Sequence, residues 1–258
     1  MRKSHGVDGR VAIVTGAGRG IGRATALALA ARGARVLGVS RTEEELASLA
    51  KEAPVEVLVE TVATQEGCEH VVEETHRRLG LVEILVLNAG IGSAEERPIW
   101  EQDPDVWRAT MAVNLDGPFF LTRLAARDMK EEGWGRIVMV SSTSGELGSP
   151  ANSAYTASKH GLMGLMRAVA QDLGPFGVTC NAVLPGWVRT AMAERSARFE
   201  AERRGITVEE VWAERDAEYP VGRVVTPEEI AATIAFLASE EASGINAEGI
   251  TVALGAVW

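Results

Sequence analysis

The stretch VAIVTGAGRGIG, residues 11–22, joins a short apolar run to a turn that contains four glycines. The apolar run predicts a buried strand, and the residues after it predict the start of a helix. Gly16 permits the tight turn, Gly20 lets the backbone approach a pyrophosphate, and Gly22 permits close packing of helix on strand. The helix N-terminus would add N–H groups and partial positive charge. Glycine-rich turns also serve as plain corners, so the strand-turn-helix context carries our prediction of a dinucleotide site.

Beyond this stretch, short β-branched runs alternate with longer helical patterns. We expect strands at 11–14, 35–39, 55–59, 83–87, 136–140, 178–183 and 250–253, and helices at 20–32, 43–51, 66–79, 105–131, 153–173 and 227–239. Such alternation predicts right-handed crossovers and a doubly wound parallel sheet with helices on both faces, a three-layer α/β architecture. No linker, repeat or low-complexity tract divides the chain, so we expect one domain over residues 1–258.

Three helix starts show the capping-box pattern, in which a threonine is followed three residues later by a glutamate. The pairs are Thr42/Glu45, Thr207/Glu210 and Thr226/Glu229. One charged segment, residues 191–219, breaks the alternation, and we expect it to form one or two short helices. It follows the carboxyl end of a strand, where ligands bind in open α/β sheets, so we interpret it as a substrate lid.

Composition narrows the possible partners and locations. The chain has 258 residues, a net charge of −10 and no block of Lys and Arg, which argues against nucleic acid or an anionic membrane. The two cysteines, Cys68 and Cys180, and the four histidines lack metal-ligand spacing, so we expect no metal and two reduced buried thiols. No apolar stretch resembles a signal peptide or a membrane span, and we expect a cytoplasmic protein.

The segment 155–159, sequence YTASK, contains the clearest chemical signal. On a helix, Tyr155 and Lys159 lie on one face, one turn apart. An ammonium beside a phenol favours the phenolate and lowers a pKa that is ordinarily about 10. The pair would then give and take a proton near neutral pH. Together with the glycine turn, this pair predicts hydride transfer combined with proton transfer.

These residues are part of an ordered set of motifs, and in that set the chain resembles the short-chain dehydrogenase/reductases of the core single-domain type. The resemblance covers nearly the whole length and implies a Rossmann-type fold and a homotetramer. The matching elements are residues 15–22, 88–90 (NAG), Asn114, Ser142, the Tyr155-x-x-x-Lys159 pair, and 185–190 (PGWVRT). Any single element is weak, but their order and spacing make the set specific.

The resemblance implies a role for each of four side chains. Tyr155 would be the general acid/base, and Ser142 would hydrogen-bond the same substrate oxygen and polarise the carbonyl. Lys159 would lower the pKa of Tyr155 and hold the nicotinamide ribose. Asn114 would position a water that links Lys159 to solvent, although its amide would also suit a purely structural role in a bent helix. The spacing of thirteen residues to Tyr155 selects Ser142 among its hydroxyl neighbours.

The implied cofactor site draws on the glycine turn and the ends of several strands. It comprises Gly16, Arg19, Gly20, Ile21, Gly22, Ser40, Arg41, Val62, Asn88, Ala89, Gly90, Tyr155, Lys159, Pro185, Gly186, Val188 and Thr190. Many relatives have an aspartate after strand three that bonds the adenine, and Thr61 stands there in this chain. We therefore expect that contact to come from the backbone and Val62.

The end of strand two predicts which nicotinamide cofactor is used. NAD selectivity normally relies on an acidic residue there. This chain has Ser40 at that place and Arg41 directly after it, while Arg19 lies in the glycine turn. Guanidinium groups without a carboxylate favour a 2′-phosphate, so we predict NADP(H) over NAD(H). Because an arginine at position 19 also occurs in NAD-using relatives, Arg41 carries most of this prediction.

For the substrate, the residues we expect at the boundary are Ser144, Trp187, Trp212 and Trp258. The length of 191–219 and the segment 219–223 (YPVGR) resemble aromatic-polyketide ketoreductases and also 3-hydroxybutyrate dehydrogenases. Arg41 favours a 3-oxoacyl or polyketide-type ketone reductase, acting on a small carbonyl or alcohol that is free or carrier-bound. The alternatives are an NAD-dependent 3-hydroxybutyrate-type or sugar/polyol alcohol dehydrogenase and, more remotely, a non-catalytic nucleotide sensor.

Overall fold

A seven-stranded parallel sheet forms the centre of the computed structural model, which describes residues 6–92 and 97–256. The strands are β1 (Val11–Thr15), β2 (Arg35–Ser40), β3 (Val55–Val59), β4 (Ile84–Leu87), β5 (Gly135–Val140), β6 (Val178–Pro185) and β7 (Gly249–Val252). Their order is β3-β2-β1-β4-β5-β6-β7. The order reverses between β1 and β4, where open sheets of this kind bind ligands. The predicted α/β class, single domain and all seven strands are confirmed.

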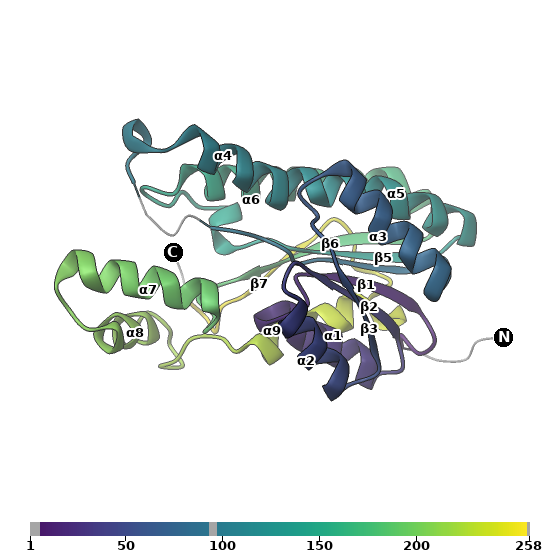
Figure 1. The fold of residues 1–258 in the computed structure, drawn as a ribbon, viewed down its shortest axis with the longest axis horizontal. Coiled ribbons are helices and arrows are strands. Elements are labelled where there is room, and N and C mark those ends of the chain that lie inside the picture. Colours follow the sequence, from purple (N-terminus) through teal and green to yellow (C-terminus); the bar gives the residue numbers. More distant parts are fainter. Residues whose placement is uncertain (1–5, 93–96, 257–258) are drawn as a thin grey trace.

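Helices cover both faces of this sheet, and Figure 1 shows the three layers. One face holds α3 (Gln65–Arg78), α4 (Pro104–Met111), α5 (Gly117–Glu132) and α6 (Ser153–Leu173). The other face holds α1 (Gly20–Ala31), α2 (Glu43–Glu52) and α9 (Pro227–Leu237). The remaining pair, α7 (Ala191–Arg204) and α8 (Val208–Ala217), extends beyond the carboxyl end of β6.

Alternate residues of the central strands supply the two halves of the core. Val14 and Val36 pack with the α1 and α9 side, whereas Ile13 and Leu37 pack with the α3, α5 and α6 side. Neighbouring residues of a strand point to opposite faces, so strands buried on both sides contain continuous apolar runs. Cys68 and Cys180 are buried free thiols in the second half, and burial raises both pKa values, that of Cys68 to about 12.

The single helix expected at 105–131 is wrong in one respect. Two α-helices, α4 and α5, are separated by a π-helical turn, Ala112–Asp116, with Asn114 at its centre. Pro118 has no N–H to donate to the Asn114 carbonyl, so the regular hydrogen-bond ladder is interrupted there. The bend places Asn114 against the carboxyl end of β4 rather than on a regular helix face.

Two of the three predicted capping boxes form, at the starts of α8 and α9. The third does not, because Glu45 accepts a hydrogen bond from Arg19 instead of from the backbone of Thr42. The charged segment 191–219 forms two helices, as expected. Within residues 6–92 and 97–256, no helix has the length and apolar character that crossing a membrane requires.

Candidate active site

A cavity of about 570 Å³ opens at the carboxyl ends of the strands, over the point where the strand order reverses. Its lining comes from the glycine turn, the ends of β2, β3, β4 and β5, the start of α6 and the segment that leads into α7. Every predicted cofactor residue except Gly22 lines it, together with Ser142, Ser144 and Trp187. Residues that are far apart in the sequence therefore meet in one site.

The glycine turn fits closely against β4. Gly16 and Gly20 have φ angles of 66° and 54°, which favour glycine. A Cβ on Gly22 would lie 2.2 Å from the Gly16 carbonyl oxygen, so Gly22 provides close packing and not cavity surface. Asn88 Nδ2 donates to the Thr15 carbonyl oxygen at 2.9 Å, and this bond ties the turn to the end of β4.

Tyr155 and Lys159 both face the cavity from α6, one turn apart. The Lys159 Nζ lies 5.5 Å from the centroid of the Tyr155 ring and donates to the Val140 carbonyl oxygen at 2.8 Å. Ser142, at the end of β5, is hydrogen-bonded to the Tyr155 side chain. Its neighbour Ser141 is buried, and its hydroxyl donates to the Lys159 carbonyl oxygen at 3.3 Å. Ser142, and not its neighbour Ser141, is therefore the serine that reaches Tyr155, as predicted from its spacing to Tyr155.

The proton affinities differ from the sequence prediction. Desolvation raises the pKa of Tyr155 above its ordinary value, and only the hydrogen bond with Ser142 acts in the opposite direction. Desolvation also lowers the pKa of Lys159 to about 8. The expectation that Lys159 holds the Tyr155 pKa low is therefore wrong for this structure, because burial raises that pKa and outweighs the hydrogen bond with Ser142. The phenol stays protonated at neutral pH.

Asn114 lies behind Gly90, outside the cavity lining. Its Oδ1 accepts from the Ile91 N–H at 2.8 Å, and its Nδ2 donates to the Ile91 carbonyl oxygen at 2.9 Å and to Ser158 Oγ at 3.0 Å. A Cβ on Gly90 would lie 3.5 Å from Asn114 Oδ1 and 3.6 Å from Lys159 Nζ. Two polar atoms thus converge beside Gly90, and a bridging water would find partners there.

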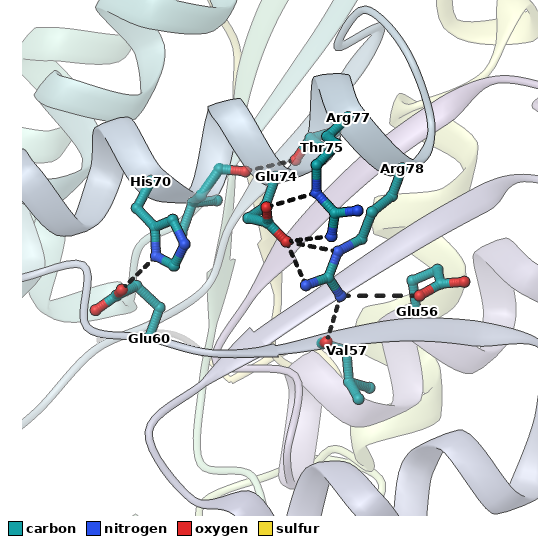
Figure 2. Close-up of polar contacts among 9 residues, drawn as sticks. Glu56, Val57, Glu60, His70, Glu74, Thr75, Arg77 and Arg78 are labelled. Carbon is teal, nitrogen blue, oxygen red and sulfur yellow. Dashed lines mark hydrogen bonds and ion pairs between the residues drawn. The ribbon is translucent and has the colours of Figure 1, made fainter.

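Sequence reasoning missed two carboxylates at the opposite end of the cavity. Glu45 Oε1 accepts from Arg19 Nη1 at 2.9 Å, whereas Arg41 is exposed and has no ionic partner within the described residues. Figure 2 shows Glu60, at the end of β3, beside His70, whose Nδ1 is 2.7 Å from Glu60 Oε2. The pKa of the Glu60 carboxyl is lowered, first by the hydrogen bond with His70 and next by the hydrogen bond that it accepts from the Thr61 N–H. Glu60 directly precedes Thr61, so inspection of one more residue at the strand end would have found it.

At the other end, Ser144, Trp187 and Met192 line the cavity. Ser144 Oγ lies 3.2 Å from Ser149 Oγ, which makes a short hydroxyl pair on the wall. The lining also includes Arg195, an exposed residue of α7 that sequence reasoning did not select. Trp258 lies outside the described residues.

The expectation that Trp212 borders the substrate is wrong. Its side chain is buried under α7, and its indole N–H donates to Glu194 Oε2 at 2.9 Å. Arg215, also buried, stacks 3.7 Å from the Trp187 ring centroid and 5.1 Å from that of Trp212. This stack joins α8 to α7 and to the segment after β6, so Trp212 supports the wall without forming its surface.

Comparisons with known proteins agree with this geometry. The sequence model of a family described as Enoyl-(Acyl carrier protein) reductase matches residues 16–256. The chain belongs to the short-chain dehydrogenase/reductase family. It is an oxidoreductase that acts on CH–OH or keto groups. Within the described residues, no group of three or more His, Cys, Asp or Glu side chains is arranged to hold a metal ion.

Individual relatives cover almost the whole chain. D-beta-hydroxybutyrate dehydrogenase of Cupriavidus necator is 35% identical over 98% of this chain and 96% of its own length. The 3-oxoacyl-[acyl-carrier-protein] reductase FabG of Salmonella typhimurium is 35% identical over 95% of this chain and 96% of its own. A crystal structure of a variant actinorhodin polyketide ketoreductase with NADPH has a TM-score of 0.90 and 34% identity, covering 96% of this chain and 98% of that one.

Proposed function

We propose that the protein is an NADP(H)-dependent reductase of 3-oxoacyl or polyketide-type ketones. The main observation that supports this proposal is that Ser142, Tyr155 and Lys159 face the same cavity as the glycine turn and Arg41. Relatives with 35% identity include a 3-oxoacyl reductase, and a ketoreductase with NADPH shares the fold. These likenesses support the reaction class, and the residues of this chain support the assignment of roles.

Ketone reduction requires a hydride at carbon and a proton at oxygen. When bound, NADP(H) supplies the hydride. The Tyr155 hydroxyl donates its proton to the carbonyl oxygen, and the Ser142 hydroxyl donates a hydrogen bond that offsets the negative charge developing on that oxygen. A phenol whose pKa is raised by burial is protonated and suits this donor role.

Lys159 and Asn114 would return the proton to Tyr155. The Lys159 ammonium would hydrogen-bond the nicotinamide ribose, and a water beside Gly90 would link it to the Asn114 amide. Lys159 Nζ and Asn114 Oδ1 border the same small space, because a Cβ placed on Gly90 would lie 3.6 Å from the first atom and 3.5 Å from the second. Asn114 would perform this role in addition to its structural bonds with Ile91.

The residues present fit a dinucleotide. The positive φ angles of Gly16 and Gly20 and the N-terminus of α1 provide a backbone cradle that suits a pyrophosphate. Ser40 and Arg41 would hold the 2′-phosphate. Val62 and Asn88–Gly90 would border the adenosine side, and Pro185, Gly186, Val188 and Thr190 the nicotinamide side.

The helices α7 and α8 would act as a lid over the substrate, which is a small carbonyl compound, free or carrier-bound. Ser144, Trp187 and Met192 would contact it. We also propose a homotetramer assembled through α4, α5 and α6. Trp107 on α4 and Phe119 on α5 are 41% and 47% exposed, and Leu165 and Val169 on α6 are half-buried. Such surface apolar groups favour burial against another copy.

The test measures NADPH oxidation by the purified protein with acetoacetyl thioesters and 3-oxo esters. We expect turnover, and Tyr155→Phe should lower kcat by roughly 10²–10⁴ while NADPH fluorescence shows unchanged binding. A variant with wild-type kcat would remove Tyr155 from the mechanism.

The relative that oxidises D-beta-hydroxybutyrate favours a second candidate, an NAD-dependent dehydrogenase. Turnover of 3-hydroxybutyrate or a polyol with NAD⁺, without turnover of any ketone with NADPH, would select it. NADPH binding with no turnover in any assay would instead support a non-catalytic sensor.

A further inference from the structure

Glu45, the third residue of α2, does not form the capping box that its sequence pattern predicts. In α8 and α9, Glu210 and Glu229 accept from the backbone N–H of the capping threonine at 2.8 and 2.9 Å. In α2 the N–H of Thr42 is directed to Ser40 Oγ at 3.4 Å, and Glu45 makes no capping bond. The carboxylate of Glu45 is turned toward the cavity, whose wall it helps to form.

That carboxylate lies over the glycine turn and beside Ser40. Its Oε1 accepts from Arg19 Nη1 at 2.9 Å. A Cβ on Gly18 would lie 2.6 Å from Glu45 Oε2 and 3.2 Å from Ser40 Oγ. Glu45 and Ser40 therefore border the same small volume. Arg23 fixes the local backbone, since its Nη1 donates to the Glu45 carbonyl oxygen at 3.3 Å.

We propose that Glu45 is a specificity-determining residue that weakens the preference for NADP(H). This inference rests on the NADP(H) site proposed above. A 2′-phosphate beside Ser40 meets a carboxylate of like charge, and Glu45 competes with the phosphate for the Arg19 guanidinium. The free 2′-hydroxyl of NAD(H) makes no such demand and can donate a hydrogen bond to the carboxylate.

Arg41 and Arg19 should contribute differently to binding of the 2′-phosphate, because only one of them is already paired among the described residues. Arg41 has no ionic partner within the described part of the chain, so it can bind a phosphate without breaking an existing bond. Arg19 is already paired with Glu45, and the nearby carboxylate reduces what Arg19 contributes to phosphate binding. The missing acid at the end of β2 is thus partly replaced by an acid from the next helix.

The experiment compares the Kd of NADPH and of NADH, by nicotinamide fluorescence, in the wild type and in Glu45→Gln. Glutamine keeps the shape and removes the charge. We expect the ratio of Kd for NADH to Kd for NADPH to rise roughly five- to thirtyfold, mainly through tighter NADPH binding, as expected when one partly exposed like charge is removed. Glu44→Gln is the matched control, because Glu44 lies exposed in the same helical turn and does not line the cavity.

A ratio that stays within twofold of the wild type, or that falls, would overturn the proposal. A fall would mean that Glu45 holds Arg19 in a productive position. In an Arg19→Gln background the effect of Glu45→Gln should shrink, because the competition for Arg19 is gone. The starting preference of the wild type tests the NADP(H) assignment separately, since a change in the ratio can be measured from either starting value.

Discussion

Replacing Lys159 with methionine should make the protein more stable at neutral pH while it removes a group that the proposed mechanism needs. The Lys159 side chain is 4% exposed, and the hydrogen bond that it makes goes to a neutral acceptor, the Val140 carbonyl oxygen. Its ammonium is therefore buried without a carboxylate partner. Methionine fills a similar volume without a charge, so the variant avoids this desolvation.

The size of the effect follows from the pKa of Lys159, which burial lowers from 10.5 to about 8. At 1.36 kcal/mol per pH unit, this difference corresponds to about 3 kcal/mol. Below pH 8 the folded and unfolded chains are both protonated at this residue, and the full penalty is present. Between pH 8 and 10.5 the unfolded chain binds more protons, so the free energy of unfolding of the wild type rises with pH.

The assay is urea unfolding of wild type and Lys159→Met at several pH values from 7 to 10.5. The stability advantage of the variant should shrink by about 3 kcal/mol across this range, equivalent to roughly 6–12 °C in Tm. Lys51→Met, which changes an exposed lysine on α2, should show no such trend. The reasoning is refuted if the difference between wild type and Lys159→Met does not change with pH.

Three further outcomes are expected. Arg41→Ala should raise the Kd of NADPH roughly ten- to a hundredfold and leave that of NADH nearly unchanged, and equal weakening of both cofactors would contradict the NADP(H) assignment. In the same binding assay, Ser40→Asp should shift the preference toward NADH. Light scattering at micromolar concentration should report a tetramer, and a mass near 27.5 kDa would exclude it. Arg215→Met should raise KM for the ketone and leave the Kd of NADPH unchanged, because Arg215 stacks on Trp187 behind the substrate wall; a changed NADPH Kd with unchanged KM would contradict that role.

The parts of the fold that could be predicted are those set by local pattern. The strand runs, the glycine turn and the spacing of Tyr155 and Lys159 each depend on residues close together in the sequence. The π-helical turn at Asn114 also has a local signal, Pro118 four residues later, which the helical periodicity of 105–131 concealed. A proline within a helical pattern should have divided that helix at the sequence level.

The parts that could not be predicted depend on which of several partners a side chain takes. From the sequence, Trp212 could face a substrate or pack between α7 and α8. In the structure its side chain is buried beside Arg215, so it packs between the helices. The pKa of Tyr155 depends on desolvation, which no spacing reveals, and so the local argument from Lys159 gave the wrong direction. Pairwise spacing describes what two groups can do to one another, whereas burial acts on each of them separately.

The capping glutamates show how such a choice is made. Glu229 keeps its bond to the Thr226 N–H and also pairs with Arg223, because that arginine lies just before the helix and reaches the same carboxylate. Arg19 approaches Glu45 from the glycine turn, and the carboxylate turns away from the helix start to meet it. The bond to Arg19 joins two full charges, and Ser40 Oγ accepts from the Thr42 N–H in place of Glu45. The same threonine–glutamate pattern therefore ends as a helix cap in α9 and as a charged cavity wall in α2, according to which arginine binds the glutamate.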